Sequence, residues 1–506
     1  KRPDVPDDPG VTLRGYDFSF DPKKLDLRQE TGAVQYGLTF DDEGQRYVCS
    51  NSSHCIAIIH SWPWVGLNLP SPKVSIPVDG GSAEVYRTSG VEPWRVVRTR
   101  WRVQGAVRGP IEGGGRDSGY FTSASGLGIY RGEALPAEFR GNLFVGDVGS
   151  NLVHRKLVEK SADRVRLQAR RPDDELKTEF LTSTDNWFRP VICKNGPDGA
   201  LYIIDMYRET IEHPWSLPEN IKKHLDLNSG NDKGRIWRVT PKDWEYPGHY
   251  VMADASSERL VGMLGSKNGW ARDMAAQLLH ARDDLDVLAK SVPGMKSEHA
   301  RMSGMYGLLA SGKLNQQLLE GALKDKSPMV RRHALRAATE VPVPPAAIMP
   351  LATDSDPWVR FETALLLTDI GKYHVPTSTL VELANASQGD DWIIAAVVEA
   401  ATKRGDVAEL FQKVWDPAVN KPIYTKLAAR AKAGEESAAI AGEIAKLDNL
   451  ALAVSILKSL RSRPVDVLKP IIDKAKSDDS AAGVWLLGLD KETSSETFWN
   501  LVESKP

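Results

Sequence analysis

The chain has 506 residues, of which 26% are charged and 41% are hydrophobic, and its formal net charge is -2. This length calls for at least two domains, and the composition is that of an ordinary globular protein. A near-neutral charge gives no support for nucleic-acid binding, and no run of about 20 apolar residues is present to span a bilayer. We therefore predict neither a nucleic-acid partner nor a transmembrane segment.

Residues 37–51 and 191–205 share one strand-turn-strand pattern, in which alternating apolar runs flank a tight Asp-x-Gly or Pro-Asp-Gly turn. Residues 140–155 form a third hairpin with a Gly-rich turn, and residues 235–239 add a short strand. Short strands joined by regular turns indicate a sandwich, a barrel or a propeller. The repetition of the hairpin favours a β-propeller.

The stretch between the first two hairpins carries weaker signals. Residues 94–103 alternate roughly between apolar and basic side chains, which predicts a half-exposed strand. Residues 113–115 are three glycines without the strand-to-helix context of a phosphate loop, so we expect a flexible loop there.

Three cysteines do not make a disulfide framework. Cys49 and Cys55 flank a short loop and have the spacing to pair across a hairpin. Buried free thiols are the alternative, since unpaired cysteine behaves as a small hydrophobic residue.

From residue 257 onward the sequence has helical periodicity, and segments starting at Trp270, His299, Pro328 and Pro357 recur about every 30 residues. In the last two, Ser or Asp precedes Pro, which fits a first helical turn because its missing N–H has no partner there. A degenerate copy begins at Asp391. This pattern predicts HEAT repeats stacked into a solenoid.

Arginines recur at one position of each repeat, as Arg272, Arg301, Arg331 and Arg360. We expect a structural role for them, through carboxylates such as Asp354 or Glu362. The predicted chain is multidomain, with an all-β partial propeller over residues 1–245, a linker over 246–256, an all-α HEAT solenoid over 257–405 and irregular helical repeats over 406–506.

Several motifs of the first half are highly specific. They are YRGEALP (130–136), RGN (140–142), NLVHR (151–155), FRPV (188–191), GPDGALY (196–202), DMYRE (205–209) and IEH (211–213). Over about residues 30 to 370 the chain resembles the membrane-bound dehydrogenase family of planctomycetes and verrucomicrobia. The resemblance implies a glucose/sorbosone dehydrogenase-like propeller of the NHL and quinoprotein type, HEAT repeats, and a periplasmic or extracellular, membrane-associated location.

Family members carry further blades ahead of this point and, often, a C-terminal c-type haem domain. The sequence contains no C-x-x-C-H haem attachment motif. A six-bladed ring needs about 40 to 50 residues per blade, so residues 1–245 supply about half to two-thirds of one. We expect additional N-terminal sequence or another chain to complete the ring.

Polar residues at strand ends are the candidates for a site. Asp205, Tyr207, Arg208 and His213 form the densest group, in which Arg208 would pair with an anionic group and His213 would act as a base. The alternative is structural, with Asp205 capping a turn and Arg208 as its ion-pair partner. Arg189 would bind a carboxylate or stack on a tryptophan such as Trp187.

A second group comprises Asp147, Asn151, His154 and Arg155. Asp147 and Asn151 are also favoured turn residues, so a structural role for them stays open. Arg46, Asn51 and His54 make a weaker third set. Asp41 and Asp42 either bind calcium, which prefers oxygen ligands, or are simply solvated.

The resemblance implies a quinoprotein-like sugar or alcohol dehydrogenase, acting on a sugar or polysaccharide-derived substrate with pyrroloquinoline quinone and calcium. Electrons would pass to a cytochrome c partner or domain. The expected catalytic residues are His213 and His154, and the expected cofactor-binding residues are Arg208, Tyr207, Asp205, Arg189, Asn151 and Arg155. The alternative is a non-catalytic carbohydrate- or protein-binding scaffold, with the HEAT surface contacting a protein partner; a propeller hydrolase such as a lactonase is a third reading.

Overall fold

The computed structural model describes residues 10–489, apart from residues 23–25, 33, 61–63, 65, 68, 70–72, 74, 80–83, 249, 283–285, 417, 420 and 479. The chain divides into two compact units. The first unit comprises Lys1–Val65, Lys73–Ser161 and Arg166–Leu314, and the second comprises Gly66–Pro72, Ala162–Val165 and Asn315–Pro506.

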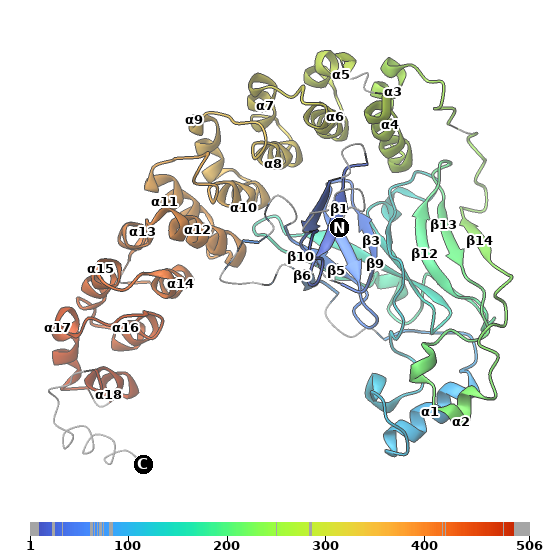
Figure 1. Cartoon of the computed structure of the whole chain (residues 1–506), viewed down its shortest axis with the longest axis horizontal. Coiled ribbons are helices and arrows are strands. Elements are labelled where there is room, and N and C mark those ends of the chain that lie inside the picture. Colours follow the sequence, from blue (N-terminus) through green and yellow to red (C-terminus); the bar gives the residue numbers. More distant parts are fainter. Residues whose placement is uncertain are drawn as a thin grey trace. The chain divides into compact units, whose positions relative to one another are not determined.

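The first unit contains three larger antiparallel sheets and one two-stranded sheet (Figure 1). The two-stranded sheet pairs β1 (Asp17–Phe20) with β2 (Leu27–Glu30). The next has the order β3 (Tyr36–Phe40), β4 (Arg46–Cys49), β5 (Ile56–Ile58) and β6 (Ser75–Pro77). The largest contains β7 (Gly128–Ile129), β8 (Leu143–Asp147), β9 (Leu152–Lys160) and β10 (Leu167–Arg170), with β11 (Leu181–Thr182) also paired to β9. The last contains β12 (Pro190–Asn195), β13 (Leu201–Asp205) and β14 (Arg235–Val239).

The three predicted hairpins are confirmed as β3–β4, β8–β9 and β12–β13. The two turns with the shared sequence pattern also have the same geometry. Asp41 Oδ1 accepts a hydrogen bond of 2.9 Å from the Glu43 amide, and Asp198 Oδ1 accepts one of 3.1 Å from the Ala200 amide. The glycines that close the two turns have φ angles of 71° and 81°, a region that glycine enters without a Cβ penalty.

The first strands of the three larger sheets lie beside one another, β3 next to β7 and β7 next to β12. Between the β7–β11 sheet and the β12–β14 sheet a hydrophobic core is built from Tyr130, Phe144, Val153, Phe188, Cys193, Leu201 and Ile203. Across the described residues these sheets form separate antiparallel layers rather than a closed ring. Cys49, Cys55 and Cys193 are all free and buried, so the cysteine pairing across the first hairpin is not formed.

The predicted strand over residues 94–103 is wrong, because the segment is the helix α1 (Pro93–Val103), which packs near the short helix α2 (Glu219–Lys222). Pro93 starts the helix, and Arg95, Arg98 and Arg102 are buried at a spacing of i, i+3 and i+7. That spacing places the three arginines along one face of a helix. The buried face of α1 is therefore cationic, and a search for apolar periodicity misses it.

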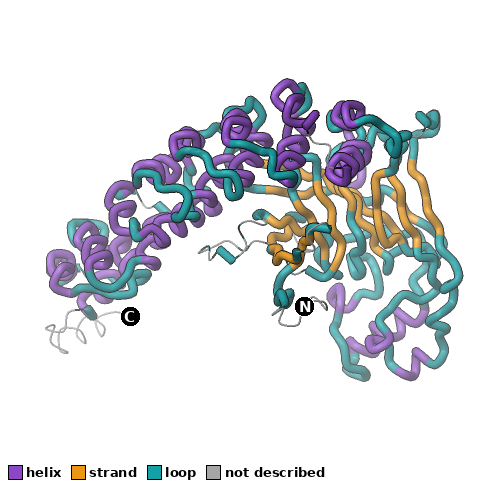
Figure 2. Tube along the Cα trace, turned by 45° about the horizontal axis from the view of Figure 1, so that its top comes forward, coloured by secondary structure: helices purple, strands orange, loops and turns teal. Residues whose placement is uncertain are grey.

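Helices fill the rest of the chain (Figure 2). The first unit holds α3 (Ser257–Met263), α4 (Gly269–Arg282), α5 (Asp286–Ser291) and α6 (Glu298–Ala310). The second unit holds α7 (Gln316–Leu323), α8 (Pro328–Ala337), α9 (Pro345–Ile348), α10 (Pro357–Leu366), α11 (Thr377–Ala386), α12 (Asp391–Arg404), α13 (Val407–Val414), α14 (Pro422–Arg430), α15 (Glu435–Ile444), α16 (Leu450–Leu457), α17 (Val465–Ala475) and α18 (Ala481–Leu487).

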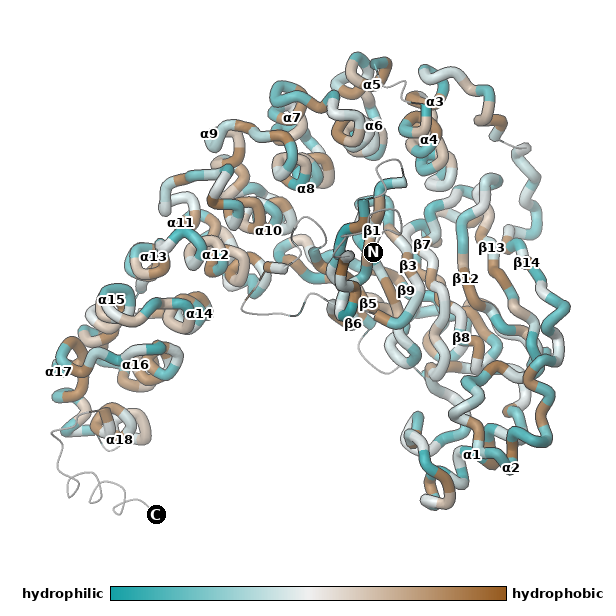
Figure 3. Tube along the Cα trace, in the orientation of Figure 1, coloured by the Kyte–Doolittle hydropathy of each residue, from teal (hydrophilic) through white to brown (hydrophobic). Residues whose placement is uncertain are grey.

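The second unit is a two-layered solenoid. In one layer α8, α10, α12, α14, α16 and α18 each contact the next, and in the other α11, α13, α15 and α17 do the same. Helix α16 is almost wholly apolar, as Figure 3 shows, and six of its eight residues are buried. Each helix therefore buries its apolar face against its neighbours, as stacked repeats require.

The recurring arginines have a structural role, but mainly through backbone carbonyls of their own loops rather than through the expected carboxylates, and Glu362 pairs with Arg332 and Arg336 instead. Arg272 Nη1 donates to the carbonyls six and five residues before it, and Arg301 and Arg360 repeat this contact at the same offsets. Arg331 additionally binds both carboxylate oxygens of Asp354 at 2.7 Å. Each arginine thus ties the loop before its helix to the helix itself.

No helix among the described residues is both long and apolar enough for a membrane crossing.

Candidate functional site

The Asp205 carboxylate is a fully occupied hydrogen-bond acceptor at the end of β13. Its Oδ1 accepts from the amides of Arg189 (2.8 Å) and Tyr207 (2.9 Å). Its Oδ2 accepts from Arg235 Nε (2.8 Å) and Trp237 Nε1 (3.1 Å) on the neighbouring strand β14. Asp205 is only 1% exposed. Its carboxylate joins β12, β13 and β14 through these four donors.

The Arg189 guanidinium is equally occupied and has no exposed surface. Nη1 and Nη2 both donate to Glu92 Oε1 at 3.1 Å. The remaining hydrogens go to backbone carbonyls, those of Val148 (2.8 Å), Arg208 (3.0 Å) and Glu209 (2.6 Å). Arg189 therefore binds a carboxylate as predicted for this residue type, but the carboxylate belongs to the chain.

Tyr207 and Arg208 shape the loop after β13. Tyr207 has a φ of 53°, its ring lies 5.4 Å from that of Trp187, and the Arg235 guanidinium stacks over it at 3.8 Å. Arg208 is half-buried and donates to the Gly230 carbonyl. The ion pair expected between Arg208 and Asp205 is thus replaced by one between Arg235 and Asp205.

Asn151 adopts a φ of 57° at the turn between β8 and β9 and is completely buried. Its Oδ1 accepts from Ser89 Oγ (2.7 Å) and Arg87 Nη2 (3.2 Å), and its Nδ2 donates to the carbonyls of Asn186 (3.1 Å) and Phe188 (2.7 Å). The side chain fastens three segments of the first unit together.

His154 and Arg155 point to opposite faces of β9. His154 Nδ1 lies 2.6 Å from Glu179 Oε2, and its ring meets that of His54 edge-on at 5.3 Å. Arg155 lies over the Phe139 ring at 4.5 Å and pairs with Glu175 Oε1 at 2.8 Å. The two residues therefore do not act on one ligand.

The two buried histidines form a stack with Phe121, whose ring lies 4.4 Å from that of His54 and parallel to it. His54 Nδ1 lies 3.1 Å from Asp79 Oδ2. Burial, reinforced by the nearby cations Lys156 and Arg171, holds the pKa of both His54 and His154 well below the usual range. Both imidazoles are therefore neutral at neutral pH.

His213 lies on the surface, apart from His154. Its Nδ1 accepts a hydrogen bond of 3.2 Å from the Trp215 amide and so caps the short turn Pro214–Ser216. Its ring is exposed.

Asp42 does not offer a free carboxylate to calcium. Its oxygens pair with the guanidinium groups of Arg131, Arg140 and Arg272. Burial raises the pKa of Asp42, but these cations outweigh that effect and hold the pKa below its usual value. Three cations around one carboxylate do not suit a calcium ligand, which needs several negative oxygens. The described residues also contain no group of three or more His, Cys, Asp or Glu side chains placed to share a metal ion.

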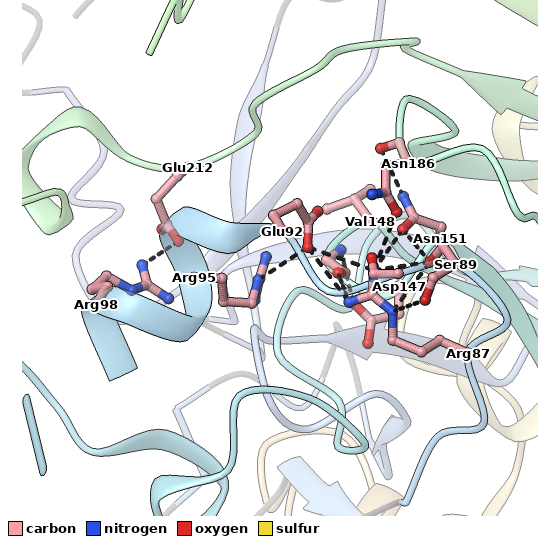
Figure 4. Close-up of polar contacts among 12 residues, drawn as sticks. Arg87, Ser89, Glu92, Arg95, Arg98, Asp147, Val148, Asn151, Asn186 and Glu212 are labelled. Carbon is pink, nitrogen blue, oxygen red and sulfur yellow. Dashed lines mark hydrogen bonds and ion pairs between the residues drawn. The ribbon is translucent and has the colours of Figure 1, made fainter. Parts of the chain in front are cut away.

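Buried arginines of α1 and the loop before it form a second polar network, shown in Figure 4. Glu92 lies at its centre, with Arg189 at 3.1 Å, Arg87 at 3.5 Å and Arg95 at 3.6 Å. Burial raises the pKa of Glu92, but the guanidinium groups outweigh it and hold the pKa below its usual value. Farther along the helix, Arg98 pairs with Glu212.

A pocket of about 800 Å³ lies beside this network in the first unit. We call it the Tyr120 pocket. Its polar lining consists of Asn51, Ser52, Ser53, Glu84, Glu112, Arg116 and Thr122, and its aromatic lining of Tyr120 and Phe121. Arg98 lies 3.8 Å from Glu112, and the Phe121 ring stacks on His54, so the pocket wall is braced by buried groups.

The Gly-rich turn packs directly on the ring of Tyr120. Gly113 has a φ of 53°, and a Cβ there would lie 2.2 Å from the ring. Gly114 has a φ of 69° but no atom within 4 Å of its own Cβ position. The predicted flexible loop is thus the 3-10 turn Glu112–Gly115, and Gly113 lets it close over Tyr120.

None of the eight predicted site residues lines the Tyr120 pocket. Asp205, Arg189, Tyr207, Arg208 and Asn151 do come together, but as a network that joins strands and loops. Sequence reasoning placed Asn51 near a strand end and missed the rest of the pocket. No short motif signals the pocket, because its lining comes from separate segments of the chain.

Comparison with known families gives two matches, and the second begins at residue 315, where the long segment of the second unit begins. Residues 3–243 match a domain of unknown function, DUF7133, and residues 315–402 match HEAT repeats. The chain therefore carries a DUF7133 domain followed by HEAT repeats. No curated protein matches it.

Proposed function

We propose that the DUF7133 domain is a portion of a β-propeller that binds a saccharide in the Tyr120 pocket, and that the HEAT repeats serve as a surface for a protein partner. The propeller assignment is supported by three antiparallel sheets in chain order, whose first strands lie side by side. Propellers repeat such sheets around a central channel.

The Tyr120 pocket carries the binding proposal. A sugar ring has hydroxyl groups that both donate and accept hydrogen bonds, and apolar C–H faces between them. The pocket supplies acceptors in Glu112, donors in Arg116, and groups that do both in Asn51 and Thr122. The half-buried ring of Tyr120 adds a flat apolar surface with a polar end.

Binding without oxidation is favoured over quinone-dependent oxidation by the state of the candidate residues. Asp205, Arg189 and Asn151 have their polar atoms committed to partners within the chain. A quinone carboxylate would have to displace those partners from buried positions, which costs about 1–3 kcal/mol for each group left unpaired. Residues set in this way do not fit the cofactor, so sugar oxidation stays a prediction from resemblance.

The protein-partner proposal rests on the architecture of the second unit. Solenoids expose long continuous surfaces, because each repeat is covered only by its neighbours. HEAT repeats over residues 315–402 provide such a surface.

Isothermal titration calorimetry of the full chain against a panel of neutral and acidic oligosaccharides tests the proposal. We expect saturable binding that Tyr120→Ala weakens about tenfold, whereas Trp215→Ala, which removes a 91% exposed ring outside the pocket, leaves it unchanged. Dye reduction with aldoses, pyrroloquinoline quinone and calcium is measured alongside. Quinone-dependent turnover without saturable binding at the pocket would replace this proposal by the dehydrogenase.

A further inference from the structure

We infer that the saccharide bound in the Tyr120 pocket carries a carboxylate, and that Arg95 is the residue that recognises it. This inference rests on the proposed function and narrows the ligand from saccharides in general to acidic ones. It is carried by an incompletely partnered guanidinium, a surplus of positive charge, and the closeness of Arg95 to the pocket-lining Thr122.

Arg95 is buried but poorly partnered. It is 3% exposed, and its Nε has no hydrogen-bond partner among the described residues. Its ion pair with Glu92 Oε2 spans 3.6 Å, and the same carboxylate also serves Arg87 and Arg189. By contrast, the guanidinium of Arg189 donates five hydrogen bonds. A buried guanidinium that lacks such bonds is costly unless another anion completes its shell.

The network around Arg95 also has more cations than anions. Five guanidinium groups, those of Arg87, Arg95, Arg98, Arg102 and Arg189, are buried there or nearly so. They share four carboxylates, those of Glu92, Glu112, Asp147 and Glu212. One positive charge is therefore left over, and the carboxylate of a ligand would balance it.

Gly149 shows how close Arg95 lies to the pocket. A Cβ built on Gly149 would lie 2.7 Å from Thr122 Cγ2, 3.2 Å from Ser123 Oγ and 3.3 Å from Arg95 Nη2. Arg95 Nη2 and the pocket-lining Thr122 thus flank the same point. The Arg95 guanidinium therefore lies close to the Thr122 side chain and to the Ser123 hydroxyl.

A carboxylate suits this position because its two oxygens match the planar fork of a guanidinium. A neutral sugar of the same size would leave the surplus charge in place. The pocket should therefore prefer a uronate to the corresponding neutral hexose, and the preference should depend on Arg95 and on its fork geometry.

Calorimetric titrations with tetragalacturonate and with the neutral tetramer of galactose test this inference in the full chain. We expect the acidic ligand to bind at least about tenfold more tightly. Arg95→Ala should bring the two affinities together by weakening the acidic ligand only. Arg95→Lys, which keeps the charge and loses the fork, should retain part of the preference.

Arg100→Ala is the matched control, since Arg100 is an exposed arginine of the same helix, and it should behave as the unmodified chain. Sodium sulfate should compete with tetragalacturonate but not with the neutral tetramer, and sodium chloride at the same ionic strength is the control for this effect. Equal binding of both tetramers, unaffected by Arg95→Lys, would overturn the inference and leave the saccharide proposal standing. Binding of neither would overturn both.

Discussion

Replacing Asp205 by alanine removes an acceptor that four donors share, and the consequence follows from the geometry. Two of those donors are the backbone amides of Arg189 and Tyr207, and two are the side chains of Arg235 and Trp237. All converge on a carboxylate that is 1% exposed. We expect Asp205→Ala to destabilise the first unit without any ligand being present.

The size of the effect follows from the kind of bonds lost. Leaving a buried donor unsatisfied costs about 1–3 kcal/mol, and breaking one side of a buried ion pair costs about 3–5 kcal/mol. Because Arg235 is one-third exposed and regains water, the total should lie near the lower value for a pair, about 3–4 kcal/mol. In a domain of this size that corresponds to a fall in Tm on the order of 10 °C.

Differential scanning calorimetry of the full chain measures this fall in the transition of the first unit. Asp243→Ala, which removes an exposed carboxylate outside the strands, should leave the Tm unchanged. Asp205→Asn, which keeps an acceptor, should fall between the two. A normal Tm for Asp205→Ala, combined with lost saccharide binding or lost dye reduction, would refute the structural role and restore Asp205 to a ligand site.

Three further predictions concern the pocket, the buried histidines and the thiols. Gly113→Ala should weaken saccharide binding by about tenfold, because its Cβ would meet the Tyr120 ring at 2.2 Å. Gly114→Ala is the control and should bind normally, since Gly114 also has a positive φ but has open space at its Cβ position. Equal losses of affinity in the two variants would contradict the contact between Gly113 and Tyr120. Because burial lowers the pKa of His54 and His154, the unfolded chain binds more protons below pH 6.5, so stability should fall by up to about 1.4 kcal/mol per pH unit for each histidine as the pH drops from about 6.5. Urea titrations of a His54→Phe/His154→Phe variant should show a flatter dependence, and an unchanged slope would exclude these residues as its source. Burial raises the pKa of Cys49 and Cys193 to about 12 and raises that of Cys55 too, so a thiol reagent should label none of them at pH 8 until urea is added, and rapid labelling of the native chain would contradict their burial.

The parts of the fold that could be predicted are the elements that local sequence periodicity determines. The hairpins at Asp41 and Asp198 combine alternating strands with an Asp-Gly turn, and both signals lie within a few residues. Helices α8 and α10 begin at the proline that follows the N-cap position, and Asp356 caps α10 with its side chain. Such features need no knowledge of distant partners.

Helix α1 could not be predicted in this way because its buried face is charged. Buried Arg98 pairs with Glu112 and with Glu212, and Glu212 is more than a hundred residues away in the sequence. Apolar and basic residues also alternate by chance along part of the helix, which produced the strand prediction. The spacing of the arginines becomes meaningful only once their partners are known.

Candidate site residues posed a related difficulty. A polar motif at a strand end has the same sequence whether its side chains bind a ligand or each other, and here Asp205, Arg189 and Asn151 bind partners in the chain. The Tyr120 pocket draws its lining from separate segments, around Asn51 and around Glu112. No short sequence motif indicates that these two segments lie together in the fold.

Hydrogen-deuterium exchange of the full chain, with and without saturating tetragalacturonate, tests the central claim most directly. The account predicts that amides in the two segments that supply most of the pocket lining, residues 112–122 and 51–53, exchange more slowly when the ligand is bound. It also predicts no change in residues 188–208, where Asp205 and Arg189 hold the strands together. Protection confined to residues 188–208, with the pocket segments unchanged, would contradict the account.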